Sequence, residues 1–201
     1  MVLPLPAGTE LHRVHEPAYP AHTFNPTPQP SRDEGGRFDA LVAGAYAYTY
    51  LGADPHAALA ETICRDLPLG GLPRLVPWKK VQGKVLTEVV TTRPLRVLDI
   101  SVPACTHVGA GAELTMSEAR EYETTRAWAQ RLQDWMPDID GLTYRCRHDH
   151  ARIAYVLFEG NAARPRAAGA LLSSPRSVAL TSSQGLTLVR EVLHQHNATL
   201  I

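Results

Sequence analysis

The sequence predicts one domain of the α+β class, with a mixed sheet at its centre and helices flanking it. The chain has 201 residues, of which 44% are hydrophobic and 20% charged, and this suits a soluble domain with one hydrophobic core. Segments with strand patterns outnumber helical segments and do not alternate with them regularly, which disfavours a parallel βαβ fold. We therefore expect a single compact domain over residues 1–201.

The first quarter of the chain predicts a long loop followed by a strand. Residues 18–36 are rich in proline, which fixes φ and removes backbone donors, so they predict a loop. Loops of this length in compact domains are often functional. Residues 45–51 read AYAYTYL, and the period of two places Tyr46, Tyr48 and Tyr50 on one face of a strand.

Three helices are expected. Asp54-Pro55 predicts a helix start, because Asp suits the N-cap and Pro the first helical position, and the helix should reach residue 66. Residues 117–135 show the clearest helical periodicity, and residues 184–196 predict a closing amphipathic helix before a tail to residue 201. The periodic positions of the middle helix are Thr125, Trp128, Leu132 and Trp135. We expect both tryptophans to be core anchors.

The remaining regular segments are strands. Strand patterns occur at residues 81–90, 95–100, 143–146, 152–158 and 176–180. The stretch 67–77 contains a glycine pair and several prolines, so it predicts a connector.

Charge and cysteine usage restrict the class of partner. Lys plus Arg and Asp plus Glu are both 20, which argues against direct binding to nucleic acid or to a membrane surface. Cys64, Cys105 and Cys146 are far apart, so a disulfide framework is not expected and a reducing cytoplasm fits. The start of the chain lacks a signal-peptide pattern, and no apolar run is long enough to span a membrane. We expect a cytoplasmic protein.

Three segments concentrate candidate functional residues. Arg13 lies among strand-forming residues, GGRFD at 35–39 is a glycine-rich turn that carries Arg37, and Glu61 lies on a helix of mostly alanine and leucine. A glutamate in such surroundings is either paired or functional, because an unpaired buried carboxylate is costly. Taken singly, the two arginines could be surface ion-pair residues and Glu61 a solvated helix residue.

In order and spacing, these segments resemble the RES domain, a family named for arginine, glutamate and serine positions. The family pattern has an early arginine, a GRFD-like turn, a strand ending in YLA and a helix with ALAE. The matching stretches here are Arg13, GGRFD at 35–39, YLG at 50–52, ALAET at 58–62, DGLTYRC at 140–146 and YVLF at 155–158. The family's serine position falls on Cys146, whereas Ser101 and Ser173 fit the local motif less well.

The resemblance implies an ADP-ribosyltransferase-like fold and an enzyme that consumes NAD⁺ by cleaving the bond between nicotinamide and ribose. Water or inorganic phosphate would be the acceptor, so NAD⁺ is a substrate, phosphate is a potential co-substrate and no cofactor is needed. The resemblance also implies a toxin that is paired with an antitoxin of the helix-turn-helix type.

The roles of the site residues follow from the same resemblance. Arg13 and Arg37 would bind the pyrophosphate, since guanidinium groups bind phosphate oxygens in bidentate fashion. Glu61 would stabilise the positive charge that develops on the ribose. Tyr50, with Tyr48 as a second candidate, would pack against nicotinamide or ribose, and Cys146 would line the same pocket.

Two other functions stay open at this stage. One is transfer of ADP-ribose to a macromolecule, and the other is a non-catalytic NAD-binding module, which the cysteine at the serine position would favour. The His-x-His pairs 148/150 and 194/196 lack further spaced ligands, so no metal site is predicted. The sequence leaves open whether the chain forms a homo-oligomer.

Overall fold

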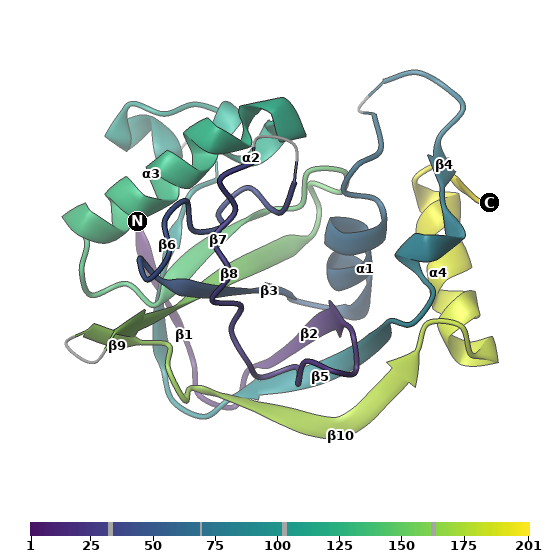
Figure 1. Ribbon diagram of the computed structural model, residues 1–201, viewed down its shortest axis with the longest axis horizontal. Coiled ribbons are helices and arrows are strands. Elements are labelled where there is room, and N and C mark those ends of the chain that lie inside the picture. The colour runs from purple at the N-terminus through teal and green to yellow at the C-terminus, as the bar shows by residue number, and fades with distance from the viewer. Residues whose placement is uncertain (32–33, 69, 102–103, 162–163) are drawn as a thin grey trace.

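A nine-stranded mixed sheet forms the centre of the computed structural model, which describes residues 1–31, 34–68, 70–101, 104–161 and 164–201 (Figure 1). Its strands are β1 (Val2–Leu5), β2 (Glu10–His15), β3 (Ala47–Gly52), β5 (Val85–Thr91), β6 (Leu95–Asp99), β7 (Gly141–Arg145), β8 (Ile153–Asn161), β9 (Arg164–Arg166) and β10 (Leu171–Ala179). The order is β1-β6-β7-β8-β3-β2-β5-β10, with β9 paired to β8. Neighbours are antiparallel except β6 and β7, so the predicted mixed sheet and α+β class are confirmed.

Helices cover the two ends of this sheet (Figure 1). They are α1 (Pro55–Ile63), α2 (Glu113–Met116), α3 (Tyr122–Trp135) and α4 (Ser183–Gln195). Helix α3 packs Ala129 and Leu132 against β7 and β8, whereas α1 and α4 pack against each other in a second cluster that includes Leu86 of β5. The sheet therefore has an apolar cluster at each end, and α1 contributes to both, with Ala57 in the first and Leu59 in the second.

The sheet curves, so that its two outer strands share a third cluster. Leu5 of β1 and Leu171 of β10 pack together with Leu11, Val89 and Leu157 from the strands between them. Side chains alternate between the two faces of each strand, which is why Leu157 belongs to this cluster and the adjacent Phe158 to the cluster under α3.

Most predicted elements are present with shifted ends. Helix α1 ends at Ile63 rather than at residue 66, and Cys64 is its C-cap residue. The helix predicted from residue 117 begins at Tyr122 and is preceded by a 3₁₀ turn. Strand β3 has the expected alternation, and Tyr46, Tyr48 and Tyr50 pack in the cluster beneath α3. Among the described residues, no helix is long and apolar enough to cross a membrane.

The prediction that both tryptophans of α3 are core anchors was wrong for Trp135, which is 55% exposed. The buried residues of the helix are Tyr122, Thr125, Arg126, Ala129, Leu132 and Gln133, and neither tryptophan is among them. Trp128 is partly buried and contacts Trp135 edge-on, with 6.1 Å between ring centroids. The two indole rings thus cover the side of the core rather than fill it.

The ends of the predicted connector and of the C-terminal tail pair with each other. Strand β4 (Leu75–Val76) lies in the former and β11 (Thr199–Leu200) in the latter, and the two run parallel. Two-residue strands have no readable period, so the sequence pattern could not reveal them.

The described part of the proline-rich loop, 18–31 and 34–36, is irregular apart from one isolated bridge, as predicted; residues 32 and 33 lie outside the described residues. Its second half is held by Arg126 of α3, which is fully buried. The Arg126 guanidinium donates to the carbonyls of Gln29 at 2.7 Å and Gly36 at 3.0 Å, and also to those of Ser31 and Glu34. One side chain thereby satisfies carbonyls that lack partners in regular secondary structure.

Replacing Arg126 by methionine should lower the free energy of unfolding by about 2–4 kcal/mol, because several buried carbonyls lose their donor. Urea denaturation followed by circular dichroism measures this change. Arg131→Met on the exposed face of the same helix is the matched control and should change stability by less than about 1 kcal/mol. Equal losses in the two variants would show that Arg126 does not hold the loop.

Candidate functional site

Glu61 is positioned by the close packing of α1 onto the end of β3. Asp54 caps the helix by accepting from the Ala57 N–H at 2.8 Å. Glycine is required at position 52, the last residue of β3, since a Cβ there would lie 2.3 Å from the backbone nitrogen of Ala58. The helix therefore starts against the strand, and its second turn carries Glu61 to Tyr144 of β7.

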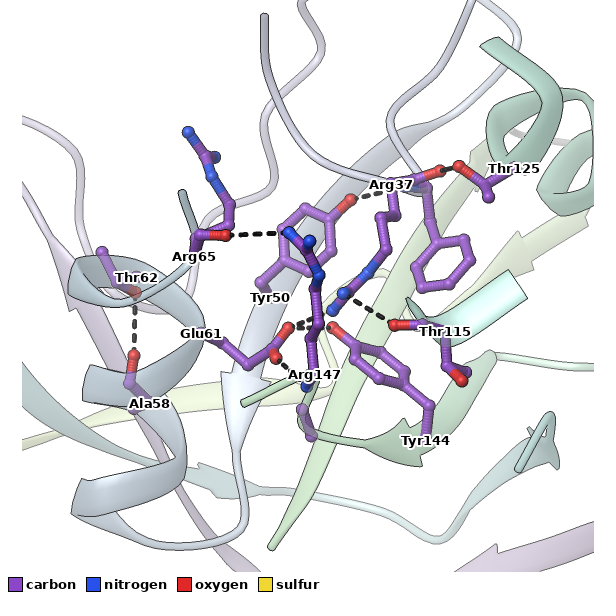
Figure 2. A network of polar contacts seen from close by, with 12 residues as sticks. Arg37, Tyr50, Ala58, Glu61, Thr62, Arg65, Thr115, Thr125, Tyr144 and Arg147 are labelled. Carbon is purple, nitrogen blue, oxygen red and sulfur yellow. Dashed lines mark hydrogen bonds and ion pairs between the residues drawn. The ribbon is translucent and has the colours of Figure 1, made fainter. Parts of the chain in front are cut away.

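Three donors hold the Glu61 carboxylate (Figure 2). Its Oε2 forms an ion pair with Arg37 Nη2 and accepts from the Tyr144 hydroxyl at 3.3 Å, and its Oε1 accepts from the Arg147 backbone N–H at 2.9 Å. The side chain of Glu61 is 14% exposed. A carboxylate offers about four lone-pair positions. One acceptor position therefore stays available for a ligand.

The Arg37 guanidinium is buried and binds acceptors within the protein. Besides Glu61, it donates to the Thr115 carbonyl at 2.8 Å, and it lies 5.2 Å from the centroid of the Tyr144 ring. Burial acts to lower the pKa of Arg37, but the Glu61 carboxylate, Tyr144 and Tyr122 together raise it above its ordinary value. Arg37, only 4% exposed, thus orients Glu61 instead of presenting free donors to a phosphate.

The turn that carries Arg37 is built around Asp39. Asp39 accepts from the Gly36 N–H at 2.7 Å and from the Tyr50 hydroxyl at 2.7 Å, and that hydroxyl accepts from the Phe38 N–H at 2.8 Å. A Cβ at Gly36 would lie 2.6 Å from the Tyr50 hydroxyl oxygen, so only glycine fits. Burial and the Asp39 carboxylate raise the pKa of Tyr50, which stays a neutral donor.

Arg13 and Tyr48 hold the first half of the proline-rich loop. Arg13 Nη1 donates to the carbonyl of Ala21 at 3.0 Å and to that of Thr23. Burial lowers the pKa of the Arg13 guanidinium to about 10. The Tyr48 hydroxyl donates to the Thr27 carbonyl at 3.0 Å. These two residues of β2 and β3 therefore fix the loop above the sheet.

These side chains surround one cavity of about 210 Å³. Five of the predicted residues line it, namely Arg13, Arg37, Tyr48, Tyr50 and Glu61. They come from β2, the 35–39 turn, β3 and α1, so segments far apart in the sequence converge as expected of a common site. The remaining predicted residue, Cys146, is absent from the described residues that line the cavity.

Cys146 is fully buried in the core cluster beneath α3. Burial raises the pKa of its thiol, and the nearby Glu61 carboxylate adds to the effect. The thiol has no hydrogen-bond partner that the described residues reveal. Cys146 therefore packs behind the site rather than on its wall.

Sequence reasoning missed three residues that shape the site. Tyr144 lies in the DGLTYRC motif and Asp39 in the GGRFD motif. Both could have been chosen as candidates from the sequence, but their contacts could not be predicted from it. The backbone N–H of Arg147 has no sequence signal, because it depends on how β7 ends beside α1. Among the described residues, no three His, Cys, Asp or Glu side chains gather as metal ligands.

The model of the RES domain matches residues 10–179 of the chain. The chain belongs to the RES-domain family. The matched region contains all six residues predicted for the site, and no curated protein sequence matches the chain at a significant level.

This RES domain is similar in structure to a chain in the crystal structure of the M. tuberculosis MbcT–MbcA toxin–antitoxin complex. The TM-score is 0.62 with 18% sequence identity, and the match covers 93% of this chain and 92% of that one. At this identity the likeness supports the fold, and it extends over nearly the whole RES-domain chain.

Cys146→Ser should lower the free energy of unfolding by about 1–3 kcal/mol, because a hydroxyl would be buried without a partner. Cys105→Ser is the control, since the Cys105 thiol already donates to the Gly111 carbonyl at 3.3 Å and a hydroxyl could do the same. Thermal unfolding of both variants measures the difference. If Cys146→Ser is as stable as the parent, then a hydrogen-bond partner for the serine hydroxyl lies within reach, and the packing role of the cysteine is refuted.

Proposed function

We propose that this RES-domain protein degrades NAD⁺ by cleaving the bond between nicotinamide and ribose, and that it acts as the toxin of a toxin–antitoxin pair. One observation carries the enzymatic part of the proposal. The Glu61 carboxylate lies on the wall of a cavity, is held from behind by Arg37, Tyr144 and the Arg147 N–H, and has an acceptor position to spare.

The chemistry of N-glycosidic cleavage requires such a group. As the bond to nicotinamide breaks, positive charge develops on the ribose ring, and a fixed carboxylate stabilises it without having to reorganise. Glu61 performs this role, and its free acceptor position takes a ribose hydroxyl. Tyr48 and Tyr50 supply flat aromatic surfaces on the same cavity wall for the nicotinamide ring.

The size of the cavity indicates which part of NAD⁺ it takes. Pockets that enclose a whole drug-sized ligand measure roughly 300–1,000 Å³, whereas this cavity measures about 210 Å³. It accommodates the nicotinamide–ribose end of the dinucleotide, and the phosphates and adenosine extend beyond it. This placement puts the scissile bond beside Glu61.

The toxin role rests on the family and on the structural neighbour. MbcT belongs to a toxin–antitoxin complex, and its chain has the same fold over almost its full length. We extend that arrangement to this protein and infer a protein antitoxin of the helix-turn-helix type as its partner. Loss of cellular NAD⁺ would be the basis of toxicity.

Glu61→Gln should reduce NAD⁺ consumption by at least about 100-fold, since the neutral amide cannot stabilise the developing charge. Purified protein is incubated with NAD⁺, with and without inorganic phosphate, and products are identified by chromatography and mass spectrometry. Free ADP-ribose indicates hydrolysis, phosphorylated ADP-ribose indicates phosphorolysis, and a labelled macromolecule indicates transfer.

The matched control is Glu191→Gln, the same chemical change on an exposed residue of α4 outside the cavity. It should consume NAD⁺ at the parental rate. Thermal unfolding of Glu61→Gln verifies that the fold survives the loss of the ion pair. A folded Glu61→Gln protein with parental turnover would remove Glu61 from the reaction, and a parent without any turnover would refute the proposed activity.

A further inference from the structure

A second cavity adjoins the first and shares two of its lining residues, Arg65 and Tyr122. It measures about 480 Å³ and is also lined by Arg147, Arg120 and Glu118. Arg147 follows the end of β7, and its backbone N–H is the group that binds Glu61. Arg147 therefore connects the second cavity with the Glu61 carboxylate, which lines the first.

The Arg147 guanidinium is buried but poorly satisfied. Its side chain is 5% exposed. Nη1 lies 3.3 Å from the Arg65 carbonyl, and Nη2 lies 3.4 Å from Oε1 of Glu118. Ordinary N–H···O bonds measure about 2.9–3.0 Å. The Nε atom is buried and has no hydrogen-bond partner among the described residues. A buried cation with such long contacts is costly, and an anionic ligand would relieve that cost.

The cationic side chains that line this cavity outnumber the anionic ones, which favours binding of an anion. Three arginines line it, and its carboxylates are Asp66 and Glu118. Asp66 is engaged by Arg65 at 2.9 Å. The Glu118 side chain is 46% exposed. Its carboxylate oxygens lie 3.4 Å from Arg147 Nη2 and 3.6 Å from Arg120 Nη2, so it forms a long ion pair with each arginine and a short one with neither.

We propose that Arg147, assisted by Arg65, binds a phosphate-type oxyanion in this second cavity. In this structure, the Glu118 carboxylate makes a long contact with the Arg147 guanidinium at the position proposed for the oxyanion. The inference rests on the proposed function for the identity of the neighbouring substrate. It adds a third candidate to Arg13 and Arg37, whose predicted binding of the pyrophosphate stays a prediction and whose guanidinium groups also bind protein acceptors. The oxyanion is either the pyrophosphate of the dinucleotide or free inorganic phosphate.

Isothermal titration calorimetry with inorganic phosphate, in the absence of NAD⁺, tests the site. Arg147→Gln should weaken phosphate binding at least about tenfold, because a charge-assisted contact is lost. Arg190→Gln, on an exposed position of α4, makes the same change of charge elsewhere and should bind as the parent does. Absence of phosphate binding to the parent, or equal binding to the parent and a folded Arg147→Gln, would overturn the proposal.

A second variant guards against a folding defect in Arg147→Gln. Glu118→Gln removes the competing negative charge but keeps the oxygen acceptor, and it should tighten phosphate binding at least about threefold. Weaker or unchanged binding in Glu118→Gln would contradict the idea that the carboxylate occupies the place of the anion. Since these titrations involve no turnover, their outcome is independent of whether the protein consumes NAD⁺.

The source of the oxyanion is distinguished by titrating ADP-ribose and nicotinamide riboside. If the site takes the pyrophosphate, Arg147→Gln weakens ADP-ribose binding but not nicotinamide riboside binding, and inorganic phosphate competes with ADP-ribose. If the site takes free phosphate, ADP-ribose and phosphate bind together, and Arg147→Gln leaves ADP-ribose affinity unchanged. Both patterns support the oxyanion subsite, and each assigns it to one ligand.

Discussion

The buried ion pair between Arg37 and Glu61 is the constraint around which this site is organised. Taking two charges out of water costs several kcal/mol per ion, and the cost is offset only when further hydrogen bonds satisfy both partners. The Thr115 carbonyl completes Arg37, and the Tyr144 hydroxyl and Arg147 N–H complete Glu61. The pair thus fixes how α1, the 35–39 turn and the end of β7 meet.

This constraint explains why α3 matters to a site that it hardly lines. The Thr125 hydroxyl donates to the Arg37 carbonyl at 2.6 Å, and Arg126 binds the Gly36 carbonyl next to it. Helix α3 therefore holds the backbone of the turn, while Glu61 holds the guanidinium that the turn carries. The functional geometry and the packing of the fold are consequently stabilised by the same contacts.

Local patterns in the sequence were enough to locate most elements, whereas the five cavity-lining residues were singled out through the resemblance to the RES domain. The tyrosine alternation of β3 and the Asp54-Pro55 helix start depend on neighbours in the chain, so they could be read directly. The partners of Arg13 and Arg37 could not, because these arginines bind backbone carbonyls whose positions depend on the strand order and on the path of the loop. The prediction that Cys146 lines the pocket failed because the sequence around the end of β7 does not reveal which side chains meet the cavity and which meet the core.

The hydrogen-bond partners of the arginines also indicate which cavity would bind each end of the proposed substrate. A guanidinium that binds buried acceptors can turn to a phosphate only with its remaining N–H donors, since each acceptor left unpaired would cost about 1–3 kcal/mol. Arg13 and Arg37 are in this position on the wall of the smaller cavity. Arg147 has the opposite character, since its guanidinium loses only long contacts by turning to a ligand. Under the proposed function, the smaller cavity takes the ribose and the nicotinamide ring, which is cationic in NAD⁺, beside the Glu61 carboxylate, and the oxyanion binds at Arg147 in the adjoining larger cavity.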